Sequence, residues 1–298
     1  MNDYPDRPEQ LIGVAQAGQL IRPDAPDGLR HRIALRWAIV DDLDRRLPYR
    51  DTLQCPLCGH QGGAARPAAG HGSGQAQQLS ASLSSFSTRV SYCIFGGGDL
   101  IRYACPSCDL IFGPEKMLAL SEHALAEEYE WHYRAYREGD STEQELRAFY
   151  ALKPRRDGIY LNWGAGDWSR TLDVLRSEGW NAVGFEPHPS GAPARPGVMT
   201  DWRQISAMRF DGIFSNNVLE HLRYPLRELR VMAGLLAPGG RMSHATPCFA
   251  YRYEFTRFHI FFYLGRSQSL LAQKSGLSIV SHEADGDFIN LVMGSGSA

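Results

Sequence analysis

From about Lys153 to the C-terminus, short apolar runs of strand type alternate with amphipathic runs of helix type, and only short turns separate them. Such alternation is typical of βαβ units, which pack their helices on both faces of a mostly parallel sheet. The last two strand-type runs lie close together and could form a hairpin at the sheet edge. We expect seven strands, at 158–163, 181–186, 197–200, 211–215, 240–245, 278–283 and 288–293. The second half of the chain is therefore predicted to be an α/β domain.

The first half has no such alternation. Residues 28–47 predict one amphipathic helix, because six apolar residues recur near helical spacing: Ile33, Leu35, Ala38, Ile39, Leu43 and Leu47. The segment from Gly62 to Ser85 has too few apolar residues to pack well and is predicted to be a long loop. We expect four parts: a helical lead at 1–50, a cysteine-bearing module at 51–115, a helical connector at 116–152 and the α/β domain at 153–298.

Four of the six cysteines form two Cys-x-x-Cys pairs, Cys55 with Cys58 and Cys105 with Cys108. Two residues between cysteines let both sulfurs face one metal ion, and four thiolates complete a closed tetrahedral site that suits structural Zn²⁺. A redox pair or unrelated buried cysteines are the alternatives. A redox pair usually opens a helix within a βαβ unit, whereas turn-like residues follow each pair here. The spacing therefore predicts a zinc site.

The charge balance argues against a polyanionic partner. The formal net charge is −2 and the isoelectric point is about 6.6, so no basic excess attracts DNA or RNA. No apolar run reaches the roughly 18 residues of a membrane-spanning helix, and the first ten residues lack the basic start and apolar stretch of a secretory signal. We expect a cytoplasmic protein that binds small molecules.

A glycine-rich turn opens the α/β domain. The first predicted strand runs into Gly164-Ala165-Gly166, after which a helix begins. Glycines at this junction let the backbone turn sharply and approach a ligand, while the helix start offers N–H groups to a carboxylate. About 20 residues later, Glu186 ends the second strand, where its side chain can accept hydrogen bonds from both hydroxyls of a ribose. Together these features indicate a cofactor site.

Two later motifs are more specific, namely VLEHL at 218–222 and LAPGG at 236–240. With the glycine loop and Glu186 before them, they give the α/β domain a pattern that resembles class I S-adenosylmethionine-dependent methyltransferases. The resemblance implies a Rossmann-like, seven-stranded methyltransferase sheet and S-adenosylmethionine as the cofactor. The cofactor-binding residues that it implies are Asn162, Gly164, Ala165, Gly166, Trp168, Glu186, Pro187, Asp201, Trp202, Asn216 and Asn217.

Two positions depart from the family's loop pattern. The loop usually begins with Asp or Glu, but Asn162 stands there and brings no charge to the methionine ammonium of the cofactor. The third glycine is replaced by Trp168, whose bulk would crowd the methionyl side unless its ring turns away or stacks on the ligand. NAD is the lesser alternative as cofactor, because a dinucleotide loop needs a glycine where this chain has Ser169.

The methyl group of a sulfonium is already electrophilic, so the protein mainly aligns the acceptor and removes its proton. The resemblance places Glu220 and His221 at the tip of the fourth strand, and a histidine can change protonation near neutral pH. A structural role at a helix start is the equal alternative for this pair. His259 and Tyr133, or Tyr136 one turn on, are further candidates, each with packing in the core or a lid as its alternative.

The cysteine pairs add a second resemblance, to bacterial sugar and natural-product methyltransferases that carry a small N-terminal zinc-binding module. We therefore expect methyl transfer to an O or C atom of a small molecule, such as a sugar, a sugar nucleotide or a natural-product intermediate. Asn162 and Trp168 leave open a zinc-ribbon interaction protein whose methyltransferase domain has lost turnover. The zinc ribbon also leaves open an RNA methyltransferase.

Overall fold

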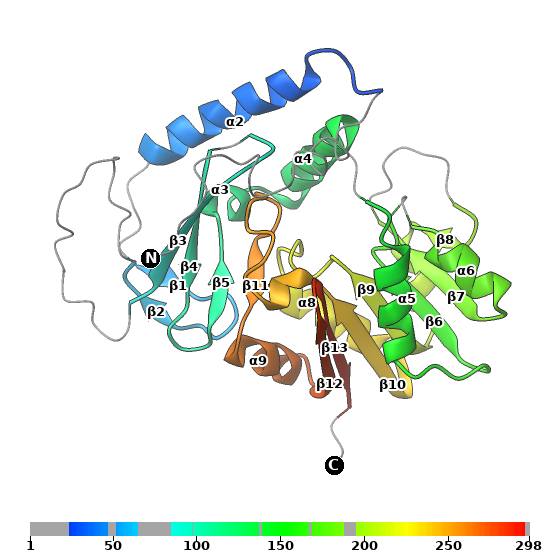
Figure 1. Cartoon of the computed structure of the whole chain (residues 1–298). Helices are drawn as coiled ribbons and strands as arrows, with labels where there is room; N and C mark the ends of the chain where they lie inside the picture. Colours follow the sequence, from blue (N-terminus) through cyan, green and yellow to red (C-terminus); the bar gives the residue numbers. More distant parts are fainter. Residues whose placement is uncertain are drawn as a thin grey trace.

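The described part of the chain contains a seven-stranded β-sheet, a four-stranded β-sheet and a two-stranded hairpin, and helix α2 (Leu29–Arg46) lies across the four-stranded sheet (Figure 1). The computed structural model describes residues 24–46, 52–64, 85–96, 98–136, 139–166, 169–187 and 195–295. Most of the predicted long loop, as well as Leu47, Trp168 and much of the predicted helical lead, lies outside these residues.

The larger sheet has seven strands in the order β12-β13-β10-β9-β6-β7-β8. From β8 to β10 every neighbouring pair is parallel, whereas β13 runs antiparallel to both β10 and β12. The strand bounds are β6 (Ile159–Trp163), β7 (Asn181–Phe185), β8 (Val198–Met199), β9 (Phe210–Asn216), β10 (Leu236–Ala245), β12 (Ser278–Asp285) and β13 (Phe288–Gly294). All seven predicted strands are confirmed, as are the α/β class and the hairpin at the sheet edge.

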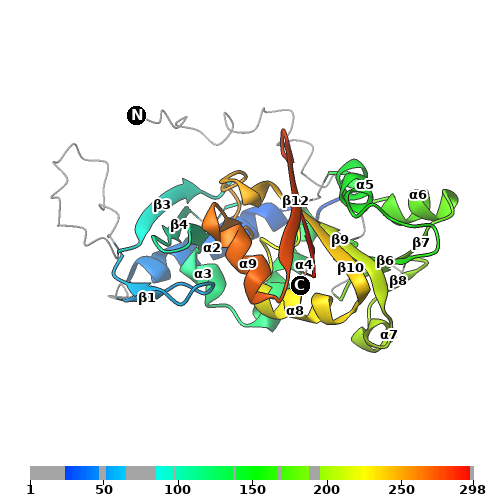
Figure 2. The same cartoon turned by 90° about the horizontal axis from the view of Figure 1, so that it is seen from below.

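Helices cover both faces of this sheet, with α5 and α6 on one face and α7 and α8 on the other (Figure 2). Successive strand residues point to opposite faces. The ring of Tyr160 accordingly meets Phe149 of α5, while Leu161 joins the core under α7 and α8. The helix bounds are α5 (Thr142–Ala151), α6 (Thr171–Ser177), α7 (Trp202–Ser206), α8 (Pro225–Gly234) and α9 (Arg266–Lys274). No helix within the described ranges has both the length and the apolarity to cross a membrane.

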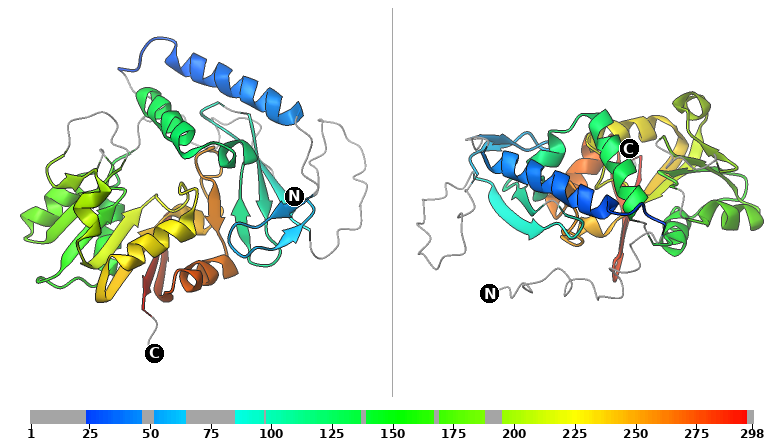
Figure 3. Two further views of the ribbon diagram at one scale, coloured as in Figure 1. Left: turned by 180° about the vertical axis from the view of Figure 1, so that it is seen from behind. Right: turned by 90° about the horizontal axis from the view of Figure 1, so that it is seen from above.

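The smaller sheet combines strands from both halves of the chain. Its order is β11-β5-β4-β3, and a separate hairpin pairs β1 with β2. Residue Phe262 of β11 lies opposite Ile111 of β5 in an antiparallel pair, and Figure 3 shows β11, in orange, at the edge of the smaller sheet that faces the larger one. The bounds are β1 (Leu53–Gln54), β2 (Gln61–Gly62), β3 (Ser87–Tyr92), β4 (Asp99–Ala104), β5 (Leu110–Phe112) and β11 (Phe261–Tyr263). The cysteine-bearing module is thus completed by residues far beyond it in the sequence.

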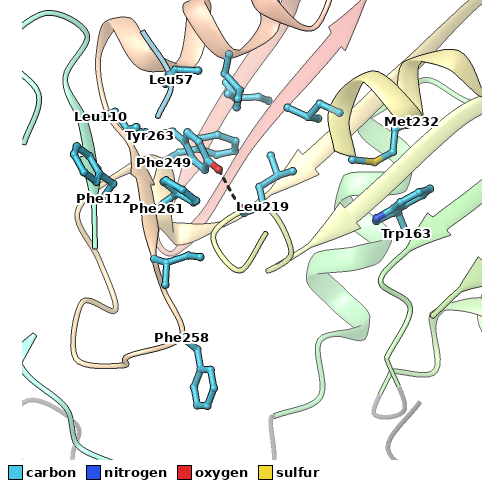
Figure 4. Close-up of a cluster of buried hydrophobic side chains, with 14 of the residues drawn as sticks. Leu57, Leu110, Phe112, Trp163, Leu219, Met232, Phe249, Phe258, Phe261 and Tyr263 are labelled. Carbon is cyan, nitrogen blue, oxygen red and sulfur yellow. Dashed lines mark hydrogen bonds between the residues drawn. The ribbon is translucent and has the colours of Figure 1, made fainter. Parts of the chain in front are cut away.

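A continuous apolar core joins the two sheets (Figure 4). Leu57 and Leu110 from the smaller sheet's side lie near Phe261 and Tyr263 of β11. The hydroxyl of Tyr263 donates a hydrogen bond of 2.9 Å to the backbone oxygen of Leu219, which follows β9 of the larger sheet. Burial of these large side chains, at about 25 cal/mol per Å² of apolar surface, holds the sheets together.

The predicted helix at 28–47 is confirmed, but its buried face differs from the expected one. Leu29, Ile33 and Trp37 are buried, whereas Leu35 is 52% exposed and Ile39 63% exposed. Polar contacts decide which face turns inward: the indole N–H of Trp37 donates to Glu128 over 3.0 Å, and Asp41 pairs with the buried Lys116. These partners lie in the predicted connector, which forms α3 (Glu115–Leu118), α4 (Glu122–Ala135) and α5.

Candidate active site and metal centre

Four parallel strands bring the candidate cofactor residues to one edge of the larger sheet. The carboxyl ends of β6, β7, β9 and β10 are adjacent, because these strands pair in parallel register. The glycine loop follows β6, Glu186 follows β7 and Asn217 follows β9. In open α/β sheets, ligands bind in the crevice beyond the carboxyl ends of the strands. The fold therefore collects at one edge residues that are up to about 55 positions apart in sequence.

The glycine loop is held against the end of β7. The backbone N–H groups of Gly164 and Ala165 both donate to the oxygen of Phe185, over 2.9 and 3.1 Å. The N–H of Gly166 donates to Oε2 of Glu186 over 3.1 Å. At Gly164, where φ is +70°, a Cβ would lie 2.7 Å from a methyl carbon of Val218. This position has room only for glycine, as a closely packed loop requires.

Asn162, the last candidate before the loop, is buried with its side chain on the α5 face of the sheet. Its amide nitrogen donates a hydrogen bond of 2.7 Å to Glu145 of α5. The structure therefore places a carboxylate next to the position where the family's loop carries one. Glu145 lies in the predicted connector, and its helical spacing alone did not mark it as a site residue.

The candidates after β7, β8 and β9 lie around the same edge. Asp201 caps α7 by accepting a hydrogen bond of 2.9 Å from the N–H of Arg203. Trp202 is 43% exposed and meets Phe185 edge-on, with ring centroids 6.4 Å apart. Asn217 has a left-handed backbone, with φ of +54°. The cap role accounts for Asp201 without a ligand, and the binding roles of these residues, together with Pro187, Asn216 and Trp168, stay predictions.

His221 and His259, two of the candidate bases, lie side by side with ring centroids 4.9 Å apart. Nδ1 of His221 lies 3.1 Å from the backbone oxygen of Phe258 and 2.8 Å from the hydroxyl of Tyr129. A proton on Nδ1 would be donated to the Phe258 carbonyl, which only accepts hydrogen bonds, and would leave Nε2 as the basic atom of the neutral ring. Burial lowers the pKa of His221 to about 4, although the Phe258 carbonyl opposes this shift.

His259 has the same arrangement of its ring, since its Nδ1 lies 2.9 Å from the backbone oxygen of Tyr253. The same Nδ1 lies 3.4 Å from Sγ of Cys248. Burial lowers the pKa of His259 well below its usual value, and the positive charge of Arg102 adds to this shift. Burial likewise raises the pKa of the Cys248 thiol, with nearby Glu220 adding to the rise. The pair is therefore a neutral thiol beside a neutral imidazole.

Glu220 is fully buried beneath this group. Its Oε1 accepts a hydrogen bond of 2.6 Å from Thr246, and its backbone oxygen accepts one of 3.0 Å from the N–H of Ile260. These contacts link the residues after β9 and β10 to the segment that enters β11. Such a position favours the structural alternative for Glu220 and leaves His221 as the better candidate base.

Sequence reasoning chose Tyr133 and missed Tyr129, one helical turn earlier on α4. Tyr129 contacts His221 directly and stacks on Phe258, with ring centroids 4.5 Å apart, while Tyr133 stacks on Tyr129 at 6.0 Å. Tyr136 instead meets His132 and Phe95. The spacing of four residues between Tyr129 and Tyr133 was the available signal, because it puts both on one helix face.

Arg102 of β4 fixes the backbone that presents His259. Its guanidinium is fully buried and donates to the backbone oxygens of Glu254, Thr256 and His259 over 2.8 to 3.2 Å. It also donates to the hydroxyl of Ser91 over 2.9 Å. A buried charge is tolerated only when its donors are satisfied, so this strand of the smaller sheet orders the segment 254–259 at the candidate active site.

The four cysteines of the two pairs converge on one point. Their Sγ atoms all lie within 4.8 Å of one another, with Cys55 3.6 Å from Cys108 and Cys58 3.6 Å from Cys105. Four sulfurs at about 2.3 Å from a tetrahedral zinc ion would lie about 3.8 Å apart, so the spacing fits Zn²⁺.

The two cysteine turns have the same backbone. Gly59 and Asp109, which follow the second cysteine of each pair, both have left-handed backbones, with φ of +82° and +65°. The N–H groups of these residues donate to the oxygens of Cys55 and Cys105, over 3.0 Å in both cases. Asp109 also pairs with Arg266 of α9 over 2.8 Å, which lowers the pKa of Asp109 to about 2. This ion pair attaches the second cysteine turn to α9, the helix that precedes β12 of the larger sheet.

A sequence model of the family described as "methyltransferase domain" matches residues 131–282, just over half of the chain. The chain therefore belongs to this family, and the fold is that of a class I S-adenosylmethionine-dependent methyltransferase. The protein is thus a methyltransferase that uses S-adenosylmethionine. None of the curated proteins matches the chain.

Several solved methyltransferase structures are similar in part. The CcbJ methyltransferase from Streptomyces caelestis is 14% identical with a TM-score of 0.41, over 53% of this chain and 92% of that one. A 1,6-didemethyltoxoflavin-N1-methyltransferase from Burkholderia thailandensis is 15% identical with a TM-score of 0.40, over 52% and 77%. The mitomycin 7-O-methyltransferase MmcR is 14% identical with a TM-score of 0.41, over 61% and 60%. Likeness at this level carries no argument about the substrate of this chain.

Proposed function

We propose that the protein transfers the methyl group of S-adenosylmethionine to an O or C atom of a small molecule, with His221 as the general base. The observation that supports this most is the fixed ring of His221 beside the carboxyl edge of the sheet. A proton on Nδ1 would be donated to the Phe258 carbonyl, so that Nε2 could accept a proton from the acceptor. A lowered pKa keeps the ring unprotonated at neutral pH, and it also makes the ring a weaker base than an ordinary histidine.

The residues around the edge suit the cofactor. Glu186 would hold the ribose, because its carboxylate accepts hydrogen bonds from hydroxyl groups, and the glycine loop would let the amino-acid end approach the backbone closely, since no atom of the described residues lies within 4 Å of the Cβ position of Gly166. When bound, S-adenosylmethionine supplies an electrophilic methyl group. The protein's own part is to align the acceptor and to remove its proton.

Aromatic rings on α4 and before β11 support a small acceptor with an apolar or ring face. Tyr129, Phe258 and the two histidines lie together, and Tyr133 extends the group. Aromatic faces stack on flat rings and on the C–H faces of sugars. A sugar, a sugar nucleotide or a natural-product intermediate stays the preferred acceptor.

We propose further that Cys55, Cys58, Cys105 and Cys108 bind one structural Zn²⁺, and that residues 51–115 form a zinc module between a lead at 1–50 and a connector at 116–152. The sulfur spacing and the matched turns support the metal. A closed set of four thiolates leaves no position for a substrate, so the ion would act as a scaffold.

The base is tested by His221→Ala, with the exposed His123 of α4 changed to Ala as the matched control. Formation of S-adenosylhomocysteine is followed over a panel of hydroxylated aromatics, sugars and sugar nucleotides. We expect His221→Ala to lower turnover about a hundredfold, the usual scale for loss of a general base, and to leave cofactor affinity nearly intact. Unchanged turnover would assign His221 to structure, and no binding of S-adenosylhomocysteine at millimolar ligand would overturn the enzyme function.

A further inference from the structure

Asn162 turns its amide oxygen away from Glu145. A carboxylate only accepts hydrogen bonds, so the nitrogen of Asn162 must face Glu145, as the distance of 2.7 Å shows. The oxygen, Oδ1, is buried and has no hydrogen-bond donor among the residues that the structure describes. Leaving such an acceptor unsatisfied costs about 1 to 3 kcal/mol, which indicates that a ligand donor completes it.

Glu145 holds both ends of the cofactor loop. Ser169, which follows the loop, donates to the same Oε2 over 2.9 Å, and Ser141 donates to Oε1 over 2.6 Å. The side chain of Glu145 is nearly inaccessible, in a residue that is 5% exposed. Burial raises the pKa of Glu145, while the hydrogen bonds from Ser141, Ser169 and Asn162 oppose the rise. Oε1 accepts from Ser141 and Oε2 accepts from both Asn162 and Ser169, and these are the contacts that an ionised carboxylate makes.

We infer that Glu145, acting through Asn162, supplies the negative charge that holds the ammonium group of S-adenosylmethionine, an inference that rests on the proposed function. The cofactor offers three kinds of donor to Oδ1: the ammonium, the ribose hydroxyls and the adenine amino group. A carboxylate one hydrogen bond behind the amide polarises it and favours the cationic donor. Glu186 already offers a carboxylate at the end of β7, 20 residues after Gly166, where a ribose binds.

Glu145 is thus a positioning residue rather than a catalytic one. It places on a helix outside the loop the charge that Asn162 lacks. Glu145 and Asn162 together account for three observations: the loop begins with an uncharged residue, Oδ1 of Asn162 has no donor among the described residues, and a buried carboxylate accepts hydrogen bonds from both ends of the loop.

Two ligands can show whether Glu145 supplies charge to the ammonium group or only holds the loop in place. S-adenosylhomocysteine carries the amino-acid end with its ammonium, whereas 5′-methylthioadenosine lacks it. By titration calorimetry, Glu145→Gln is expected to weaken S-adenosylhomocysteine binding about tenfold and 5′-methylthioadenosine binding less than about twofold. The matched control is Glu143→Gln, which makes the same change at an exposed position of the same helix and should alter neither affinity.

Exchanging the two groups gives a second, independent test. Asn162→Asp alone puts two carboxylates about 2.7 Å apart, so it should weaken S-adenosylhomocysteine binding although it restores the acidic loop residue. The double variant Glu145→Gln with Asn162→Asp keeps one carboxylate and one amide in exchanged places. It should bind S-adenosylhomocysteine within about threefold of the unchanged protein.

If Glu145→Gln weakens the binding of both ligands equally, the inference is overturned, and Glu145 only holds the loop in place. Unchanged S-adenosylhomocysteine affinity would overturn it as well. If Glu145→Gln does not fold, the double variant decides: affinity near that of the unchanged protein supports the inference, and tenfold weaker binding overturns it. A different result marks failure of the proposed function, namely that the unchanged protein binds neither ligand.

Discussion

The two sheets of this protein are assembled from the chain in different ways. The larger sheet takes all seven strands from one stretch, 159–294, whereas the smaller takes three strands from 87–112 and the fourth, β11, from 261–263. Closing a loop of about 150 residues costs entropy that only tertiary contacts can offset. The cysteine-bearing module therefore depends on the methyltransferase half of the chain to complete its sheet. The strands that form the cofactor edge, in contrast, all come from the methyltransferase half.

The largest expected effect comes from removing half of the metal site. Cys105→Ser with Cys108→Ser should abolish zinc binding, because two thiolates cannot form the closed site, and structural zinc is worth about 10 kcal/mol in small zinc peptides. Metal analysis should give one ion per chain before the change and none after it. Hydrogen exchange should rise in β3–β5, while S-adenosylhomocysteine affinity stays within about threefold.

Cys93→Ala is the control for this experiment, since Cys93 lies outside the cluster of four and should leave the zinc content unchanged. Complete loss of S-adenosylhomocysteine binding in the double serine variant would show that the two sheets form one cooperative unit.

Acidification should have the next largest effect. Burial lowers the pKa of His132, His221, His244 and His259, with His221 at about 4 and His244 at about 3. The unfolded chain therefore binds more protons, so these residues stabilise the fold fully above pH 6.5 and lose that contribution as pH falls. At pH 5.5 the loss is about 1.4 kcal/mol per histidine, or up to about 6 kcal/mol for the four. Glu145, whose pKa burial raises, acts in the opposite direction.

Urea unfolding at pH 7.5, 6.5 and 5.5 measures this dependence. Three of the four histidines lie at the junction of the sheets and only His244 lies within the larger one. Hydrogen exchange at pH 5.5 should accordingly rise first at α4 and β11. A free energy of unfolding that stays flat over this range would show that these histidines are not held neutral.

The third effect tests the link that β4 makes to the active-site segment. Arg102→Met removes hydrogen bonds from a buried guanidinium to three backbone oxygens and should lower the free energy of unfolding by about 4 kcal/mol. Arg89→Met is the matched control, because Arg89 lies opposite Arg102 on β3 and is exposed; its cost should stay within about 0.5 kcal/mol. Urea denaturation compares the two, and equal costs would contradict the role of Arg102.

The smallest expected effect concerns the cofactor edge. Gly164→Ala meets both a left-handed backbone and Val218, whereas Gly166→Ala meets only the backbone, with no atom within 4 Å of its Cβ. We expect losses of about 2 to 3 kcal/mol and about 1 kcal/mol in the free energy of unfolding. Adding Val218→Ala to Gly164→Ala should recover part of the difference, and thermal or urea unfolding of the three variants measures it.

Periodicity and turn chemistry were enough to predict the larger sheet. Strand and helix patterns are local, and a parallel sheet built from βαβ units follows from their order. The cysteine spacing likewise predicted a group of four sulfurs, and the structure brings them together. Helix α2 shows where local pattern fails, because partners on α3 and α4, and not its apolar spacing, decide which face is buried.

The candidate site divides in the same way. Three parts of the site could be predicted from the sequence because each follows a strand at a characteristic place. They are the glycine loop, Glu186 and the segment with Glu220 and His221. Tyr129 and Arg102 were not chosen from the sequence, since their importance comes from contacts with residues about 90 to 160 positions away.

The sequence by itself determined where the strands lie along the chain, the glycine turn and the cysteine pairs, because these depend on spacing along the chain. Only the tertiary structure decided that β11 completes the smaller sheet, that His221 lies against the Phe258 carbonyl and that Glu145 lies behind Asn162. Each of these depends on one partner's position in space, which hydrophobic periodicity does not encode.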